Sequence, residues 1–81
     1  MRLTLEGHTD FVNALAFSQD SSVLVSAGDD GTLRLWDTSS GEELLVVQET
    51  ATALAFSHDG TLLASSNVDG RIQLWGIQGD V

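Results

Sequence analysis

The sequence predicts an all-β chain made of two copies of one unit. Apolar and polar residues alternate in short runs, which is typical of half-buried strands, and no stretch keeps a helical period. Small polar residues and Asp-Gly pairs separate these runs, and such residues favour turns. Shifting the 81-residue sequence by 39 places, the separation of Trp36 and Trp75, aligns it with itself without a gap. A period near 40 indicates a repeat architecture.

The alignment of the two copies includes many matched positions. The run Ala-Leu-Ala-Phe-Ser at 14–18 recurs at 53–57, and Leu-Trp at 35–36 recurs at 74–75. Serine, aspartate and glycine positions between these runs also match, and Leu5 aligns with Leu44. The pairs that carry the repeat are Asp20 with Asp59, Ser26 with Ser65, Asp30 with Asp69 and Gly31 with Gly70.

Four strands are expected in the first copy. The run 18–22 is rich in Ser and Asp, Asp30-Gly31 suits a tight hairpin, and 38–41 forms another turn. The segment 23–28 is apolar on both faces, as expected of a strand covered on both sides. The expected strands are 11–17, 23–28, 32–37 and 42–48.

Three strands are expected in the second copy, at 51–56, 62–66 and 71–75. The tail 76–81 is short and polar for a fourth strand. Residues 1–7 instead align with the last strand of the first copy, which would be the outermost of a sheet. The second copy therefore lacks an outer strand of its own, and the N-terminus carries a spare one.

Composition excludes several classes of function. The net charge of −9 argues against binding nucleic acid or anionic membranes, which need basic patches, and it suits basic partners. Without cysteine, neither disulfides nor thiolate metal sites are available, and two histidines alone cannot build a zinc site. The N-terminus has no apolar stretch long enough for a signal peptide or a membrane span. A cytoplasmic location is expected by default.

These features resemble the WD-repeat β-propeller family, in which a unit of about 40 residues forms a four-stranded blade. The first copy carries Gly7-His8, Ser26, Asp30 and a closing Trp36-Asp37. The second departs twice, with Val46-Val47 in place of Gly-His and Gly76 in place of the last aspartate. The resemblance implies a single two-blade unit over 1–81, with the first blade at 8–48 and the second at 49–81.

The resemblance also implies a buried network in each blade. An indole N–H only donates, a carboxylate only accepts, and a hydroxyl and a neutral imidazole do both, so Trp, Ser, His and Asp can form an unbroken chain. The second blade cannot complete this chain because Val47 has no polar group, and we expect it to be looser there. The expected network residues are His8, Ser26, Asp30, Trp36, Ser65, Asp69 and Trp75.

Catalysis is the alternative reading of the same residues. A serine, a histidine and an aspartate could form a hydrolase triad, but the serine and aspartate recur in the copy that has no histidine, which favours the structural network. No glycine-rich phosphate loop is present. Asp29 and Asp30 could suggest a cation site, but Asp30 already belongs to the turn, and no third carboxylate lies at loop spacing. We therefore predict no enzyme, no cofactor and no metal site.

Two blades are too few for a closed ring, which typically needs four to eight. The outward faces of a lone pair would leave on the order of 15 kcal/mol of apolar burial unrealised, which rivals the stability of a domain. The spare strand 1–7 indicates how this apolar surface is covered, since it can complete the second blade of a neighbouring copy. We expect head-to-tail rings with an even number of blades: eight from four chains is favoured, and six from three is the alternative.

The expected function is a protein- or peptide-binding scaffold. In similar propellers, partners engage the rim where strands enter and hairpin turns emerge. A second possibility is a self-assembling or designed minimal propeller without a dedicated partner. A third is a fragment of a longer WD-repeat protein, although the initial Met and the two-blade phase favour a self-contained unit. The expected partner-binding residues are Phe11, Asn13, Asp29, Thr50, Thr52 and Val68.

Overall fold

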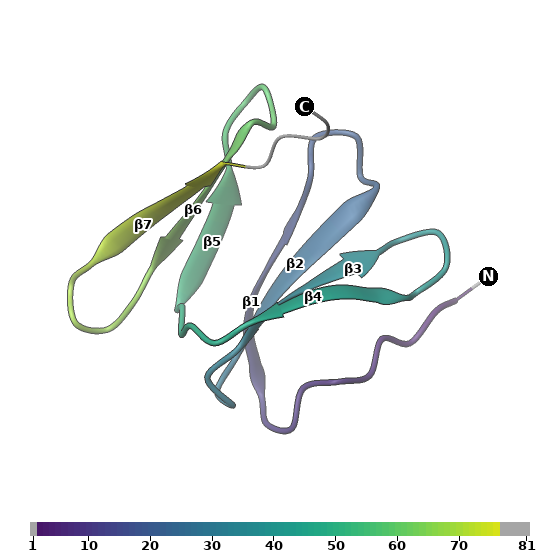
Figure 1. The fold of residues 1–81 in the computed structure, drawn as a ribbon, viewed down its shortest axis with the longest axis horizontal. Helices are drawn as coiled ribbons and strands as arrows, with labels where there is room; N and C mark the ends of the chain where they lie inside the picture. Colours follow the sequence, from purple (N-terminus) through teal and green to yellow (C-terminus); the bar gives the residue numbers. More distant parts are fainter. Residues whose placement is uncertain (1, 77–81) are drawn as a thin grey trace.

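The computed structural model describes residues 2–76, which form two antiparallel sheets (Figure 1). The first sheet has the order β1-β2-β3-β4 and the second the order β5-β6-β7, so neighbouring strands follow one another in the chain. The prediction of an all-β fold is confirmed. The strands are β1 (Val12–Phe17), β2 (Val23–Gly28), β3 (Leu33–Asp37), β4 (Glu43–Val47), β5 (Ala53–Phe56), β6 (Leu62–Ser66) and β7 (Ile72–Gly76).

The strands lie within a residue or two of their predicted ranges. At the start of β1 the register with β2 shifts between Val12 and Ala14, so Asn13 is an extra residue in the ladder. Such a bulge turns a side chain away from its regular direction. The two Asp-Gly pairs that recur in the repeat form tight turns in which the glycine has a positive φ, 84° at Gly31 and 90° at Gly70. Glycine adopts this conformation without steric cost.

The core lies between the two sheets. Ala27, Leu33 and Ala51 are almost completely buried there, and Leu54 and Trp75 of the second sheet pack against them. The middle strand β2 is covered on both faces, as its apolar sequence predicts, because its last four residues are all buried. The face of the first sheet that meets the second contains Leu33 and Leu35, while the second sheet contributes Leu54, Leu63 and Trp75.

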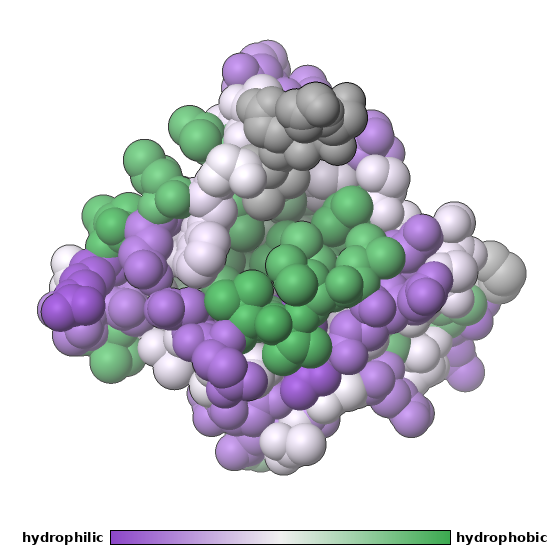
Figure 2. Space-filling model, in the orientation of Figure 1, coloured by the Kyte–Doolittle hydropathy of each residue, from purple (hydrophilic) through white to green (hydrophobic). Residues whose placement is uncertain are grey.

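The other face of each sheet is open and apolar. On the first sheet, the side chains of Leu15 and Phe17 are 60% and 58% exposed. On the second sheet, Ile72 and Leu74 are 73% and 67% exposed. Apolar surface also gathers over β3 and β4, where the four-stranded sheet extends past its three-stranded neighbour (Figure 2). The described chain therefore has two apolar faces without a partner, as the two-blade prediction requires.

The N-terminal segment runs beside the first sheet without joining it (Figure 1). Residues 2–7 form no strand within the chain, although they align with a strand in the repeat. Leu3 and Leu5 lie near Phe17 and Leu24, and Gly7 approaches the ring of Trp36. A strand needs a second backbone for its hydrogen bonds, and residues 2–7 make no such bond to another backbone within the described part of the chain. The predicted donation of residues 1–7 to another copy concerns a contact outside a single chain. The tail that follows Gly76 lies outside the described residues.

Candidate functional site

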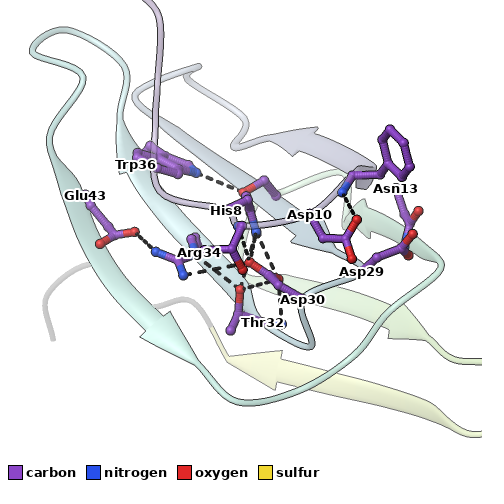
Figure 3. Close-up of polar contacts among 12 residues, drawn as sticks. His8, Asp10, Asn13, Asp29, Asp30, Thr32, Arg34, Trp36 and Glu43 are labelled. Carbon is purple, nitrogen blue, oxygen red and sulfur yellow. Dashed lines mark hydrogen bonds and ion pairs between the residues drawn. The ribbon is translucent and has the colours of Figure 1, made fainter.

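A chain of hydrogen bonds links the N-terminal segment to the core of the first sheet (Figure 3). The indole N–H of Trp36 donates to Oγ of Ser26 over 2.9 Å, and this oxygen lies 2.6 Å from Nε2 of His8. On the other side of the imidazole, Nδ1 lies 3.0 Å from a carboxylate oxygen of Asp30. With its proton on Nδ1, His8 donates to Asp30 and accepts from Ser26, so each group has a matching partner.

Asp30 is the acceptor on which this network ends. Its carboxylate accepts the backbone N–H of Thr9 at 3.0 Å and both the N–H and the hydroxyl of Thr32, at 3.1 and 2.8 Å. Burial raises the pKa of this carboxyl, but the bonds from Thr9, Thr32 and His8 together outweigh burial and hold the pKa well below its usual range. Arg34 adds positive charge at 3.8 Å. The carboxylate thus fixes the N-terminal segment to the hairpin turn.

The geometry of Ser26 argues against a hydrolase triad. The residue is only 3% exposed, and its hydroxyl oxygen already contacts both Trp36 and His8. A nucleophile must reach its substrate. A buried hydroxyl that already forms two hydrogen bonds cannot do so. Within residues 2–76, no group of three His, Asp or Glu side chains is placed to hold a metal ion, and no helix is long and apolar enough to cross a membrane.

The second sheet contains only part of the network. Trp75 donates to Oγ of Ser65 over 3.0 Å, which matches the bond in the first sheet. Asp69 has no imidazole partner, and it accepts the backbone N–H of Arg71 at 3.2 Å, as Asp30 accepts that of Thr32. The side chain of Asn67 accepts the same N–H, also at 3.2 Å. The turn at Asp69 is therefore held by local hydrogen bonds, and within the described residues no imidazole connects it to the rest of the second sheet.

Gly28 belongs to the network although it is absent from the predicted set. A Cβ atom on this residue would lie 2.5 Å from Nδ1 of His8 and 2.8 Å from Oδ1 of Asp30. The imidazole can occupy its place only because residue 28 has no side chain. Comparison of the two repeats could have identified Gly28, since Asn67 replaces this glycine in the copy where Val47 replaces His8.

Five of the six predicted partner-binding residues line one groove of about 190 Å³ between the two sheets. The groove lies where β1 and β5 begin and β2 and β6 end, so both repeats contribute to it. The bulged residue Asn13 donates from its amide to the carboxylate of Asp29, which orients both side chains (Figure 3). The groove contains Asn13, Asp29, Thr50, Thr52 and Val68, together with the unpredicted Gly28, Ala51 and Asn67.

Phe11, the sixth predicted residue, lies beside this groove. Its carbonyl oxygen accepts the N–H of Asp29 over 2.8 Å, so the two residues are fixed next to each other. Its side chain is 78% exposed, and that of Val68 is 89% exposed. The rim therefore combines an open aromatic ring, an open aliphatic side chain and a carboxylate, which is a usable combination for binding a peptide.

Comparison with known proteins matches this architecture. A family model described as "WD domain, G-beta repeat" matches residues 1–37 and 43–76. Small ribosomal subunit protein RACK1y of Oryza sativa subsp. japonica is 50% identical over 44 residues, which cover 54% of this chain and 13% of that protein. THO complex subunit 6 of Homo sapiens is 39% identical over 44 residues, with the same shares of the two chains.

Solved structures share the arrangement of the two sheets. The RRP9 WD40 repeats superpose with a TM-score of 0.84 and 29% identity over 89% of this chain and 24% of theirs. The computationally designed Ika4 protein superposes with a TM-score of 0.76 and 36% identity over 91% of this chain and 46% of its own. The chain therefore spans only a small part of the curated relatives and a quarter to a half of these structures. Since the family model covers both copies of the repeat, the chain belongs to the WD40 repeat family.

Proposed function

We propose that this chain is a non-catalytic scaffold that binds proteins or peptides as part of a closed β-propeller. The observation that carries the proposal is the groove to which both repeats contribute Asn13, Asp29, Thr50, Thr52 and Val68. Both strand entries and hairpin turns open at this end of the sheets, and Phe11 stands at its rim. Relatives of the chain include ribosomal and THO complex proteins, which is consistent with a role in binding other proteins.

The ring would form from further copies of the chain. Leu15 and Phe17 are the repeat counterparts of Leu54 and Phe56, which are half-buried against the first sheet. The exposed Ile72 and Leu74 are likewise counterparts of the buried Leu33 and the half-buried Leu35.

The open face of the second sheet in one copy should therefore fit the open face of the first sheet in the next. That contact would repeat the one already present within the chain. Such head-to-tail contacts close into rings when the rotation allows it. Four chains with eight blades remain the favoured state and three with six the alternative, with residues 1–7 donated, 8–48 forming the first blade and 49–81 the second.

The ligand class that best fits the rim is a basic peptide or protein tail. Each chain carries a net charge of −9, so four copies carry 4 × −9 = −36. Such a field attracts cationic ligands and speeds their association. Asp29 is exposed at the groove, and the ring of Phe11 beside it can contact a cationic side chain through its face. The contact would recur once per copy around the ring.

Binding is tested with a fluorescent oligo-arginine peptide and an acidic peptide of equal length. Asp29→Asn should weaken binding of the basic peptide by about tenfold, since a charged contact to a partner is worth on the order of 1–3 kcal/mol. The control is Glu42→Gln, which removes an exposed charge at the opposite end of the strands. Equal losses in both variants would mean that only net charge matters and would refute a specific site.

Light scattering tests the assembly. Four chains of 8.6 kDa give 34.4 kDa, three give 25.8 kDa, and a single chain gives 8.6 kDa. A folded single chain that unfolds cooperatively would refute the ring.

An assembled ring that binds neither peptide would favour a self-assembling propeller without a dedicated partner. The similarity to the designed Ika4 protein supports that candidate. A chain that folds only when further blades are fused to it would favour a fragment of a longer WD-repeat protein.

A further inference from the structure

The groove between the two repeats has a counterpart that one chain cannot form alone. The groove within the chain combines the rim of the first sheet with that of the second. In the proposed ring, the second sheet of one copy meets the first sheet of the next, so a similar groove arises between copies. A shift of 39 residues gives the composition of this inter-copy groove: Thr52, Asn67 and Val68 of one copy, with Phe11, Val12, Asn13, Gly28 and Asp29 of the next.

We infer that the inter-copy groove binds a bulky apolar side chain of a peptide, flanked in that peptide by basic residues. This inference rests on the proposed ring and adds a second kind of binding site to it. One wall of the groove carries Val68 of one copy, and the other carries Phe11 of its neighbour. Neither chain holds both walls of one groove, so the site exists only where two copies meet head to tail.

The two kinds of groove differ in composition at two positions. Thr50 and Ala51 line the groove within the chain, and their counterparts in the inter-copy groove are Phe11 and Val12. The difference exchanges a hydroxyl group for an aromatic ring and a methyl group for an isopropyl group. Aromatic side chains bury a large area and are frequent anchors in binding sites. The inter-copy groove is therefore the more apolar of the two.

Burial within the chain indicates which of these side chains stay open to a ligand. Ala51 is 2% exposed against the first sheet, whereas its counterpart Val12 is 48% exposed. The same packing between copies would bury Val12 at the floor of the inter-copy groove. Thr50 and Asp29 are the counterparts of Phe11 and Val68, and both are exposed although the two sheets around them are in place. The walls made by Phe11 and Val68 should therefore remain accessible in the ring.

Charge near Phe11 selects the residues that flank the apolar side chain of the ligand. The carbonyl oxygen of Phe11 accepts the N–H of Asp29, and its own N–H donates to the carboxylate of Asp10, each over 2.8 Å. Both carboxylates are exposed at this end of the first sheet (Figure 3). Arginine and lysine can lay their apolar stems along an apolar surface while their charged ends reach a carboxylate. Basic residues on either side of a bulky apolar one complement this arrangement.

Two fluorescent peptides of equal charge test the class of ligand. Arg-Arg-Leu-Arg-Arg should bind the ring about tenfold more tightly than Arg-Arg-Ala-Arg-Arg, because leucine buries more carbon atoms in the groove. Phe11→Ser and Val68→Ser should each remove this preference. Leu44→Ser is the matched control, since Leu44 is an exposed apolar side chain that lies outside the groove within the chain and is not the counterpart of any residue in it. Equal binding of both peptides to the unmodified ring would overturn the apolar site and leave a contact that depends on charge alone.

Mixing the two variants tests whether neighbouring copies share the site. Phe11→Ser chains and Val68→Ser chains are combined in urea and refolded together, so that both enter the same rings. If the copies join head to tail at random, about a quarter of the inter-copy grooves then contain both Phe11 and Val68, from two different chains. Partial recovery of tight binding of the leucine peptide would support the shared groove. Rings of unchanged mass without any recovery would overturn it, because a site within one chain stays defective in both variants.

A gain of binding gives a second readout. Thr50 is exposed, so Thr50→Phe removes no buried contact. An aromatic ring would then line the groove within the chain as well, and the number of leucine peptides bound per chain should rise from about one to about two. Thr50→Ser keeps a hydroxyl group and should leave that number at about one. The same number for Thr50→Phe would contradict the role of the aromatic ring.

Light scattering on each protein separates this inference from the ring itself. An unmodified chain that stays at 8.6 kDa would overturn both the ring and the inter-copy groove. A ring that binds both peptides equally, or that shows no recovery on mixing, would overturn only the groove. Loss of assembly in Phe11→Ser, with the unmodified chain assembled, would assign Phe11 to the contact between copies and would also overturn the groove.

Discussion

Nδ1 of His8 lies 2.5 Å from the position that a Cβ atom would take on Gly28, so the imidazole can occupy this position only beside a glycine. The imidazole completes a hydrogen-bonded chain from Trp36 to Asp30, and the glycine leaves room for it. The second repeat has neither residue, with Val47 and Asn67 in the equivalent places. The two blades therefore differ at both positions of this contact.

Gly28→Ala should destabilise the chain by about 1–3 kcal/mol, the usual cost of forcing extra atoms into a packed site. The new methyl would displace His8 or Asp30, and both are held by hydrogen bonds. Urea unfolding monitored by tryptophan fluorescence measures the change. Gly76→Ala is the control, because nothing lies within 4 Å of its Cβ position and the first repeat carries Asp37 there. Equal midpoints for the two variants would contradict a steric requirement at Gly28.

The serine partners of the two tryptophans should differ in their contribution to stability. Ser26→Ala removes the acceptor of Trp36 and the partner of His8, whereas Ser65→Ala removes only the acceptor of Trp75. Trp36 is 3% exposed, but Trp75 is half-buried and can bond to water. We expect Ser26→Ala to cost about 1–3 kcal/mol more than Ser65→Ala, the penalty of an unpaired buried group. Equilibrium unfolding at one protein concentration decides this, and equal costs would contradict the difference.

The repeat explains why most strands were predictable. The first three strands of the first copy each have a counterpart with the same alternation, and turns rich in Ser, Asp and Gly lie between them. The hydrogen-bonded neighbours of Trp36 and Ser26 were also predictable, because their spacing recurs. Residues 2–7 were different: the same alignment predicts a strand there, but within the described residues this segment forms no strand and no hydrogen bond to another backbone. Strand propensity does not form a strand without a partner.

The details of the site depend on three-dimensional contacts that periodicity does not contain. The bulge at Asn13 turns its amide toward Asp29, and period-two alternation alone places Asn13 in the regular ladder. The role of Gly28 likewise depends on how close the imidazole comes. The position of Asn13, Asp29, Thr50, Thr52 and Val68 in one groove was predictable because both repeats contribute matched loops, and Asn67 completes the groove between them.

Restoring the network in the second repeat should require two changes together. Val47→His alone places an imidazole against Asn67, at the position that a glycine leaves open in the first repeat, and it removes an apolar side chain packed on the core. We expect the free energy of unfolding of this variant to fall by about 2 kcal/mol. Adding Asn67→Gly should recover part of that loss, because Ser65 and Asp69 then become available to the imidazole. A double-mutant cycle measures the coupling, and purely additive effects would contradict it.

Acid sensitivity should depend on Asp30. Hydrogen bonds from Thr9, Thr32 and His8 hold the pKa of this carboxyl well below the ordinary value of 3.8 despite its burial. The unfolded chain therefore binds a proton there more readily than the folded chain does. It follows that the contribution of Asp30 to stability is complete above the ordinary pKa and is lost as the pH falls below it.

Asp30→Asn tests this sign. The variant should be less stable than the natural chain at pH 7, because the amide cannot accept all the bonds from Thr9, Thr32 and His8. The difference in free energy of unfolding between the two proteins should narrow as the pH falls from about 5 toward 2, since only the unmodified chain takes up a proton at this position. Urea midpoints across that range measure the gap. Glu42→Gln removes an exposed carboxylate for comparison and should run parallel to the natural chain. A constant gap between Asp30→Asn and the natural chain would show that the carboxylate charge contributes nothing to the network.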